Sequence, residues 1–183
     1  ERRAGSSASF MDPAVAEGVD IARGPGSVAY GSEAFGGVIS VRTKRPATTG
    51  TEWGGSATFG GGIPDRRAEF SFSHGFGTGG VLVAAHARSV EDYQGPDADV
   101  LNSGYGTGGL LAKAEHTLWG GTLGASLQSD FGRDIERPRN NSNAVRFYYP
   151  FDDSHRFNVA FDRTEVAGFD AVLAAFHAFA GRV

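Results

Sequence analysis

Apolar and polar residues alternate along most of the chain between residues 51 and 181. Alternation with a period of two is typical of a strand that has one apolar and one polar face. In residues 67–76, for example, Phe70 and Phe72 fall on one face, whereas Glu69 and Ser71 fall on the other. The pattern predicts antiparallel strands at 51–60, 67–76, 81–89, 109–118, 122–131, 156–162 and 169–181.

The last of these segments is the least clear. Residues 169–181 are apolar on both faces, so a buried helix competes with a strand there. We expect a strand because it continues the series. The connections alternate between short turns at 77–80, 119–121 and 163–168 and long loops at 91–106 and 132–154, after a first short loop at 62–66. Membrane β-barrels have this asymmetry between their two ends.

Alternation alone does not separate a membrane barrel from a soluble sandwich. Three features favour the barrel. The predicted strands have the length of about 9–11 residues that crosses a bilayer. The apolar faces avoid charge, as lipid contact requires, and the exceptions His74 and His116 lie near tight turns. Aromatic residues, which favour the membrane–water boundary as well as strands in general, cluster at expected strand ends: Trp53, Phe76, Trp119, Phe131, Phe147, Tyr148 and Tyr149.

Composition and charge exclude several kinds of chemistry and binding. Among 183 residues there are 28 glycines and no cysteine, which excludes disulfides and thiolate chemistry. The net charge of -4 gives no basic footprint for nucleic acid. No apolar run reaches the roughly 20 residues of a membrane-spanning helix.

The chain is expected to be a fragment. No signal peptide opens it at Glu1. Bacterial barrels have even strand numbers from about eight upward, so seven strands ending near Val183 would not close one.

A dense motif precedes the strands at residues 19–46. It reads as strand, Gly-Pro turn, short helical turn, Gly-Gly and strand. Ser27 would cap the helical turn, and upstream Asp12-Pro13 looks like a helix N-cap followed by proline. The glycines, Gly24 among them, would supply backbone angles that side chains forbid. A nucleotide-binding loop is disfavoured because Pro25 lacks the amide that a phosphate needs.

This motif resembles the end of the plug domain in TonB-dependent outer-membrane receptors. This chain departs from the family's pattern only slightly. Asp20 stands where the family commonly has Glu, and Gly18 stands where a basic residue is common. The matching residues are Arg23, Gly24, Pro25, Ser27, Tyr30, Gly31, Gly36, Gly37, Val38, Ile39, Thr43 and Lys44.

The resemblance implies a partial all-β transmembrane barrel, about seven strands of 22, at residues 47–183, preceded by the C-terminal part of a mixed α/β plug at 1–46. It implies an outer-membrane receptor that takes up a ferric siderophore, haem or cobalamin with energy supplied through TonB. The expected partners are TonB, outer-membrane lipid and a small metal-chelate ligand, and the complete protein is expected to be a monomer. The TonB box of the family would lie outside this fragment. No catalytic residue, cofactor or metal is expected.

Three sets of residues follow as site candidates. The signature residues Arg23, Gly24, Pro25, Ser27, Tyr30, Gly31, Gly36 and Gly37 are expected to be structural. A wet inner wall is expected from Glu52, Arg67, Glu69, Arg88, Lys113, Glu115, Gln128, Asp130, Arg156 and Asp162, some of them paired with Arg42, Lys44 or Arg45. Ligand contacts, competing with plain solvated loop surface, are expected from Tyr93, Asp97, Asp99, Tyr105, Arg133, Arg137, Arg139, Tyr148 and Tyr149.

Two other functions can be distinguished from that of a TonB-dependent receptor. A passive porin or adhesin would have no plug, so the motif at 19–46 argues against it. A membrane enzyme would need a catalytic constellation, and Ser154-His155 does not supply one because neighbours on a strand point to opposite faces.

Overall fold

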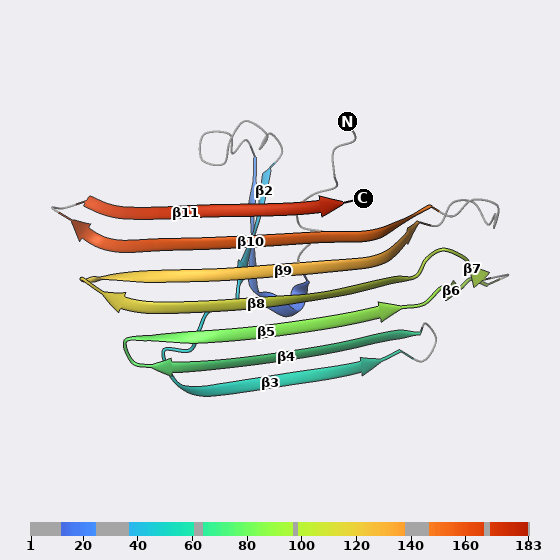
Figure 1. Cartoon of the computed structure of the whole chain (residues 1–183), viewed down its shortest axis with the longest axis horizontal. Coiled ribbons are helices and arrows are strands. Elements are labelled where there is room, and N and C mark those ends of the chain that lie inside the picture. Colours follow the sequence, from blue (N-terminus) through green and yellow to red (C-terminus); the bar gives the residue numbers. More distant parts are fainter. Residues whose placement is uncertain are drawn as a thin grey trace. The chain divides into compact units, whose positions relative to one another are not determined.

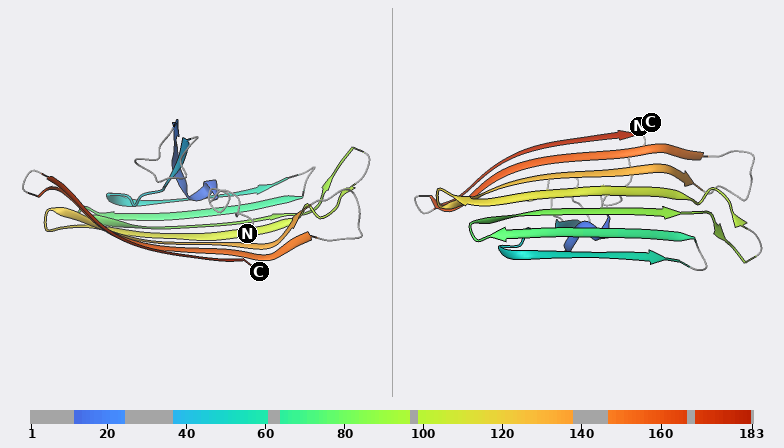
Figure 2. Two further views of the ribbon diagram at one scale, coloured as in Figure 1. Left: turned by 90° about the horizontal axis from the view of Figure 1, so that it is seen from above. Right: turned by 60° about the horizontal axis from the view of Figure 1, so that its bottom comes forward.

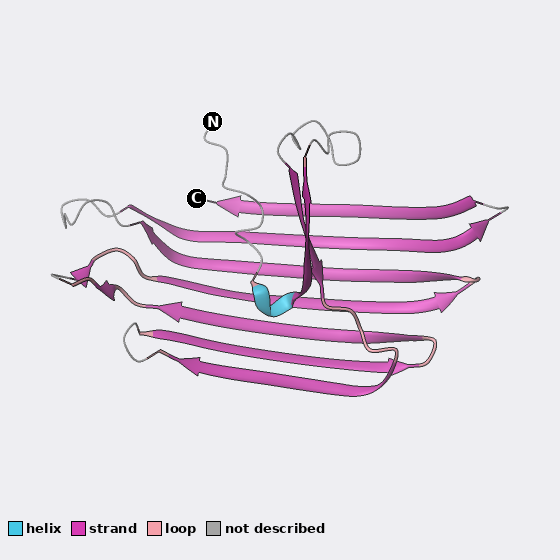
Figure 3. Cartoon of the chain, turned by 180° about the vertical axis from the view of Figure 1, so that it is seen from behind, coloured by secondary structure: helices cyan, strands magenta, loops and turns pink. Residues whose placement is uncertain are grey.

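The computed structural model describes residues 12–24, 37–60, 64–96, 99–137, 147–166 and 169–182. These residues form two compact units, 1–45 and 46–183, each described here by itself. Strands dominate the described parts of both units (Figure 3). No described helix is long and apolar enough to cross a membrane.

The first unit is a two-stranded ribbon that follows one helical turn. The 3₁₀ helix η2 (Pro13–Val15) is capped by Asp12, whose carboxylate accepts a hydrogen bond of 2.8 Å from the Ala14 N–H. Strands β1 (Ala16–Arg23) and β2 (Gly37–Thr43) pair antiparallel. The expected N-cap and both expected strands are therefore confirmed. The helical turn expected in the motif lies outside the described residues.

The second unit is built on one antiparallel sheet of seven strands (Figure 1). They are β3 (Thr49–Phe59), β4 (Asp65–Phe76), β5 (Gly79–Val90), β8 (Tyr105–Leu118), β9 (Gly121–Arg137), β10 (Phe147–Val166) and β11 (Phe169–Arg182). Each strand pairs with its neighbours in sequence order, from β3 at one edge to β11 at the other. Strands β6 (Tyr93–Gln94) and β7 (Asp99–Val100) form a separate small hairpin between β5 and β8.

The expected fold class is confirmed. The sheet is curved along its strands (Figure 2) and open, as a partial barrel requires. Residues 169–182 form a strand, so the expected strand is confirmed and the competing buried helix is wrong. The two-residue turn at Trp119-Gly120 has positive φ angles of 52° and 73°, the pattern of a type I′ hairpin.

Three details differ from the sequence prediction. The strands are 11 to 20 residues long rather than about ten. The segment expected as a long loop at 132–154 is mostly strand, because β9 runs to Arg137 and β10 begins at Phe147. Two aromatic residues expected at strand ends do not lie there: Trp53 is near the middle of β3, paired with Phe72, and Phe131 is inside β9, six residues before its end.

Candidate functional site

The described part of the signature lies where the ribbon turns. Arg23 ends β1 and pairs in register with Gly37, the first residue of β2. Gly24 and Gly37 have φ angles of +109° and +144°, a region that side chains rarely adopt, so the expected backbone angles of these two glycines are confirmed. The remaining signature residues, Pro25, Ser27, Tyr30, Gly31 and Gly36, lie outside the described residues.

The ribbon exposes an aliphatic face. Val19 and Val41 are register partners, as are Ile21 and Ile39, and Ile21 and Ile39 are 63% and 62% exposed. The opposite face carries an ion pair of 3.0 Å between Asp20 and Arg42. Arg42, one of the cations expected to pair with the inner wall, thus has a partner within its own unit. A two-stranded ribbon is marginally stable by itself.

The seven-stranded sheet has one polar face. Cross-strand pairing places all ten residues of the predicted wet wall on this face: Glu52, Arg67, Glu69, Arg88, Lys113, Glu115, Gln128, Asp130, Arg156 and Asp162. We call it the polar face.

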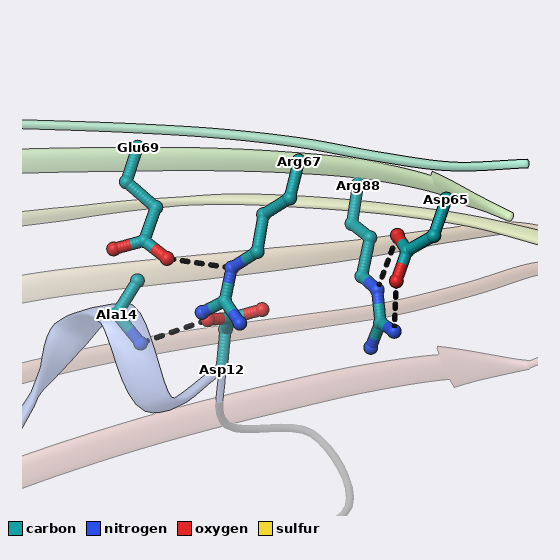
Figure 4. Close-up of polar contacts among 6 residues, drawn as sticks. All are labelled: Asp12, Ala14, Asp65, Arg67, Glu69 and Arg88. Atoms are coloured by element: carbon teal, nitrogen blue, oxygen red, sulfur yellow. Dashed lines mark hydrogen bonds and ion pairs between the residues drawn. The ribbon is translucent and has the colours of Figure 1, made fainter. Parts of the chain in front are cut away.

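At the loop end of the polar face, four charged side chains form two ion pairs (Figure 4). Asp65 accepts two hydrogen bonds from the Arg88 guanidinium, at 3.0 and 2.7 Å. Glu69 pairs with Arg67 at 2.5 Å. The same Arg88 guanidinium lies over the ring of Tyr105, 5.5 Å from its centroid. This end of the polar face therefore presents fixed, oriented charges rather than loose side chains.

A second polar cluster surrounds Asp130, which is buried. Gln128 donates a hydrogen bond of 2.8 Å to the Asp130 carboxylate, and Arg156 lies 3.6 Å from the same oxygen. Burial of such groups is tolerated because partners replace the lost water.

The opposite face is apolar. Among the side chains of β3 to β10 that the structure describes, every large hydrophobic one that is strongly exposed lies on it: Trp53, Phe59, Phe70, Phe72, Phe76, Val81, Val83, Leu110, Leu123, Leu127, Phe131 and Phe157. We call it the apolar face. His116 and His74 lie near the tight turns as predicted. On β11, His177 pairs in register with Phe157, so one histidine position falls in the middle row of this face. His74 is hydrogen-bonded to Thr51 at 2.7 Å.

The loop end of the apolar face carries a paired polar cluster that the sequence did not reveal. Arg133 of β9 forms a bidentate pair with Asp153 of β10 and lies over the Phe131 ring, 5.8 Å from its centroid. One step toward the middle, His155 is hydrogen-bonded to Ser129 at 3.1 Å. The sequence prediction missed the Arg133–Asp153 pair because it assigned residues 132–154 to a loop.

The Asp92 carboxylate holds together the two ends of the loop between β5 and β8. Asp92 accepts hydrogen bonds from three successive backbone N–H groups, those of Asn102, Ser103 and Gly104, at 3.2, 2.7 and 3.0 Å. Asn102 has a φ of 60°, which helps to turn these groups toward one point. Partial burial opposes ionisation, but the three N–H groups outweigh it and hold the pKa of Asp92 below its ordinary value.

The candidate ligand residues are distributed differently than expected. Tyr105 begins β8, and Arg133, Arg137, Tyr148 and Tyr149 belong to β9 and β10 rather than to a loop. Arg133 lies on the apolar face, whereas Tyr105 lies on the polar face. Tyr93 and Asp99 belong to the β6–β7 hairpin, and Asp97 and Arg139 lie outside the described residues.

Within the described residues, no group of three or more histidine and acidic side chains is placed to hold a metal ion.

Comparison with known proteins adds one partial similarity. The chain is 32% identical over 111 residues to the vitamin B12 transporter BtuB of Vibrio vulnificus (strain CMCP6). The matched segment covers 59% of this chain and 18% of the transporter, so the chain spans less than a fifth of the relative's length. That relative is a transporter and not an enzyme. No family model matches the chain, and no solved structure matches it significantly.

Proposed function

We propose that the chain is part of an outer-membrane receptor that takes up a scarce nutrient with energy supplied through TonB. In this proposal residues 1–46 belong to the plug and residues 47–183 to the barrel wall. The observation that carries it is the apolar face of the sheet, and the similarity to a vitamin B12 transporter supports it independently.

The apolar face has the composition and height of a lipid-contacting band. Soluble proteins rarely expose apolar patches beyond a few hundred Å², yet one cross-strand row of β3 to β10 contains five large apolar side chains that are 37% to 79% exposed. They are Trp53, Phe72, Val83, Leu127 and Phe157, with Ala112 between Val83 and Leu127.

The height follows from strand geometry. Arg66, at the loop end of β4, and Phe76, at its turn end, are ten residues apart, or ~34 Å at roughly 3.4 Å per residue. With a strand tilt of about 40°, this gives a band ~26 Å tall, near the roughly 25 Å found in outer-membrane barrels.

The polar face would then line the lumen. Its ion pairs, such as Asp65 with Arg88 and Glu69 with Arg67, allow a dense set of charges to lie on one wall without isolated buried charge. A wall of this kind suits contact with a polar plug domain rather than with lipid.

The loop end would meet the ligand. The loop anchored by Asp92, with its β6–β7 hairpin, and the long β9 and β10 strands rise at this end. Cobalamin is the first ligand to test because the relative transports vitamin B12. Ferric siderophores and haem belong to the same expected class of scarce metal chelates.

The test uses the full-length protein in a Gram-negative host that lacks its own cobalamin receptor. Uptake of cobalt-labelled cyanocobalamin, and separately of labelled ferric siderophores, is measured with TonB present, with TonB deleted, and with the proton gradient collapsed. The proposal predicts saturable uptake that needs both TonB and the gradient. Uptake that persists without TonB would instead identify a passive barrel.

A further inference from the structure

The three residues that lead into the sheet, 46–48, are held against its polar face at the turn end. Figure 3 shows this connection entering β3 beside the turn between β4 and β5. Pro46 is buried, and so are the three sheet residues that it and its neighbours contact, namely Ser73, Gly75 and Gly80. We call residues 46–48 the strap.

Hydrogen bonds tie the strap to both strands beneath it. The Ala47 N–H donates to the Ser73 hydroxyl at 2.6 Å, and that hydroxyl donates in turn to the Val81 carbonyl at 3.1 Å. The Gly77 N–H donates to the Thr48 carbonyl at 3.0 Å. One buried serine therefore links the strap to β4 and β5 together.

Two glycines make the room that the strap fills. A Cβ on Gly75 would overlap the backbone of Thr48 and lie 2.6 Å from the Ala47 carbonyl oxygen. A Cβ on Gly80 would overlap that same oxygen and lie 3.1 Å from Pro46 Cβ. The atoms in the way are mostly backbone, so the strap could not give way without losing its hydrogen bonds.

We propose that the strap is a fixed anchor which stops a pull on the preceding chain before it reaches β3. This inference rests on the proposed function, in which TonB pulls on the plug. The plug chain continues directly into Pro46, so any tension in it arrives at the strap. There the force divides between β4 and β5 through Ser73 and the Gly75–Gly80 cradle. Without the anchor, β3 would take the tension at its first residue, Thr49.

Hydrogen exchange in the full-length protein in lipid nanodiscs tests the anchor directly. Ser73→Ala removes the acceptor for the Ala47 N–H, and Gly80→Ala displaces the Ala47 carbonyl. Each variant should speed exchange at the Ala47 amide by about tenfold, as loss of one buried hydrogen bond implies.

Matched controls lie on the same face. Ser71→Ala alters the serine two residues earlier on β4, and Gly54→Ala places a Cβ whose nearest neighbour is 3.8 Å away. Neither control should change exchange at Ala47. Equal exchange in all four variants and the parent protein would overturn the anchor.

Single-molecule pulling supplies the mechanical readout. With the same protein held in a membrane and pulled from its N-terminal side, the rupture that follows extension of residue 45 should need less force in Ser73→Ala and Gly80→Ala than in their controls. An unchanged rupture force would also overturn the inference. Neither measurement uses a ligand, TonB or uptake, so a failure of the proposed transport function would be seen separately.

Discussion

His86 of β5 and Asp130 of β9 meet over Gly109, on the strand that separates theirs. The three residues occupy one cross-strand row of the polar face. A Cβ on Gly109 would overlap the His86 ring and lie 2.9 Å from an Asp130 carboxylate oxygen. The absence of a side chain on β8 at this point lets two ionisable groups from non-adjacent strands share one space.

Gly109→Ala should therefore destabilise the sheet. We expect a loss of about 1–3 kcal/mol in the free energy of unfolding, the usual cost of overpacking. Gly124→Ala is the control, because its Cβ would lie 3.8 Å from the nearest atom.

Adding His86→Ala should remove the overlap with the His86 ring, so the double variant should lose less than the two single losses combined. The measurement is denaturant unfolding of the full-length protein in detergent. Strict additivity would contradict the shared space over Gly109.

Asp92→Asn should loosen the loop between β5 and β8. Charge-assisted hydrogen bonds contribute about 1.5–3 kcal/mol each, so exchange at the amides of Asn102, Ser103 and Gly104 should rise at least tenfold near neutral pH. Glu91→Gln is the control. Its carboxylate forms an exposed pair of 3.5 Å with Arg66, which contributes little.

The effect of Asp92 should depend on pH in one direction. Its pKa is lowered in the folded protein, so the stabilisation is complete above the unfolded value of about 3.9 and is lost as the pH falls through the folded value. The parent protein and Asp92→Asn should therefore differ at pH 7 and converge in strong acid. A difference that grows on acidification would contradict the anchoring role of the carboxylate.

Two adjacent residues on β9 should differ in how much the same new charge destabilises the protein. Leu127 is on the apolar face and 41% exposed, whereas Ser126 is on the polar face. Leu127→Arg should cost about 2–4 kcal/mol in lipid vesicles, as an arginine near the bilayer midplane does. Ser126→Arg should cost less than 1 kcal/mol, near the low end of surface changes. Equal small costs, measured by reversible unfolding in vesicles, would show that water and not lipid contacts Leu127.

Alternating polarity was enough to predict the strands and their faces. Residues such as Phe70 and Glu69 alternate because the two faces have different surroundings, so the pattern reports the surroundings directly. Where both faces are polar, the signal disappears. That is why the loop end of β9 and β10, with Arg133 and Asp153, was assigned to a loop.

Pairs across strands were beyond the reach of the sequence. Arg133 and Asp153 are 20 residues apart, and only the register of β9 on β10 brings them together. His86 and Asp130 likewise come close only through the register of β5, β8 and β9. The contacts of Asp92 with the backbone of residues 102–104 also depend on the folded loop. Trp53 was misplaced for a related reason: its position near the start of a predicted strand said nothing about where that strand pairs with β4.

Collision accessibility of spin labels along β9 tests the central claim most directly. The chain has no cysteine, so single cysteines at positions 122–131 can each carry a nitroxide, provided that the rest of the full-length protein is also cysteine-free. In lipid vesicles, positions 123, 125 and 127 should collide mainly with dissolved oxygen, and positions 122, 124 and 126 mainly with a water-soluble nickel chelate. Preference for the nickel chelate at positions 123, 125 and 127 would mean that the apolar face does not contact lipid and would contradict the account.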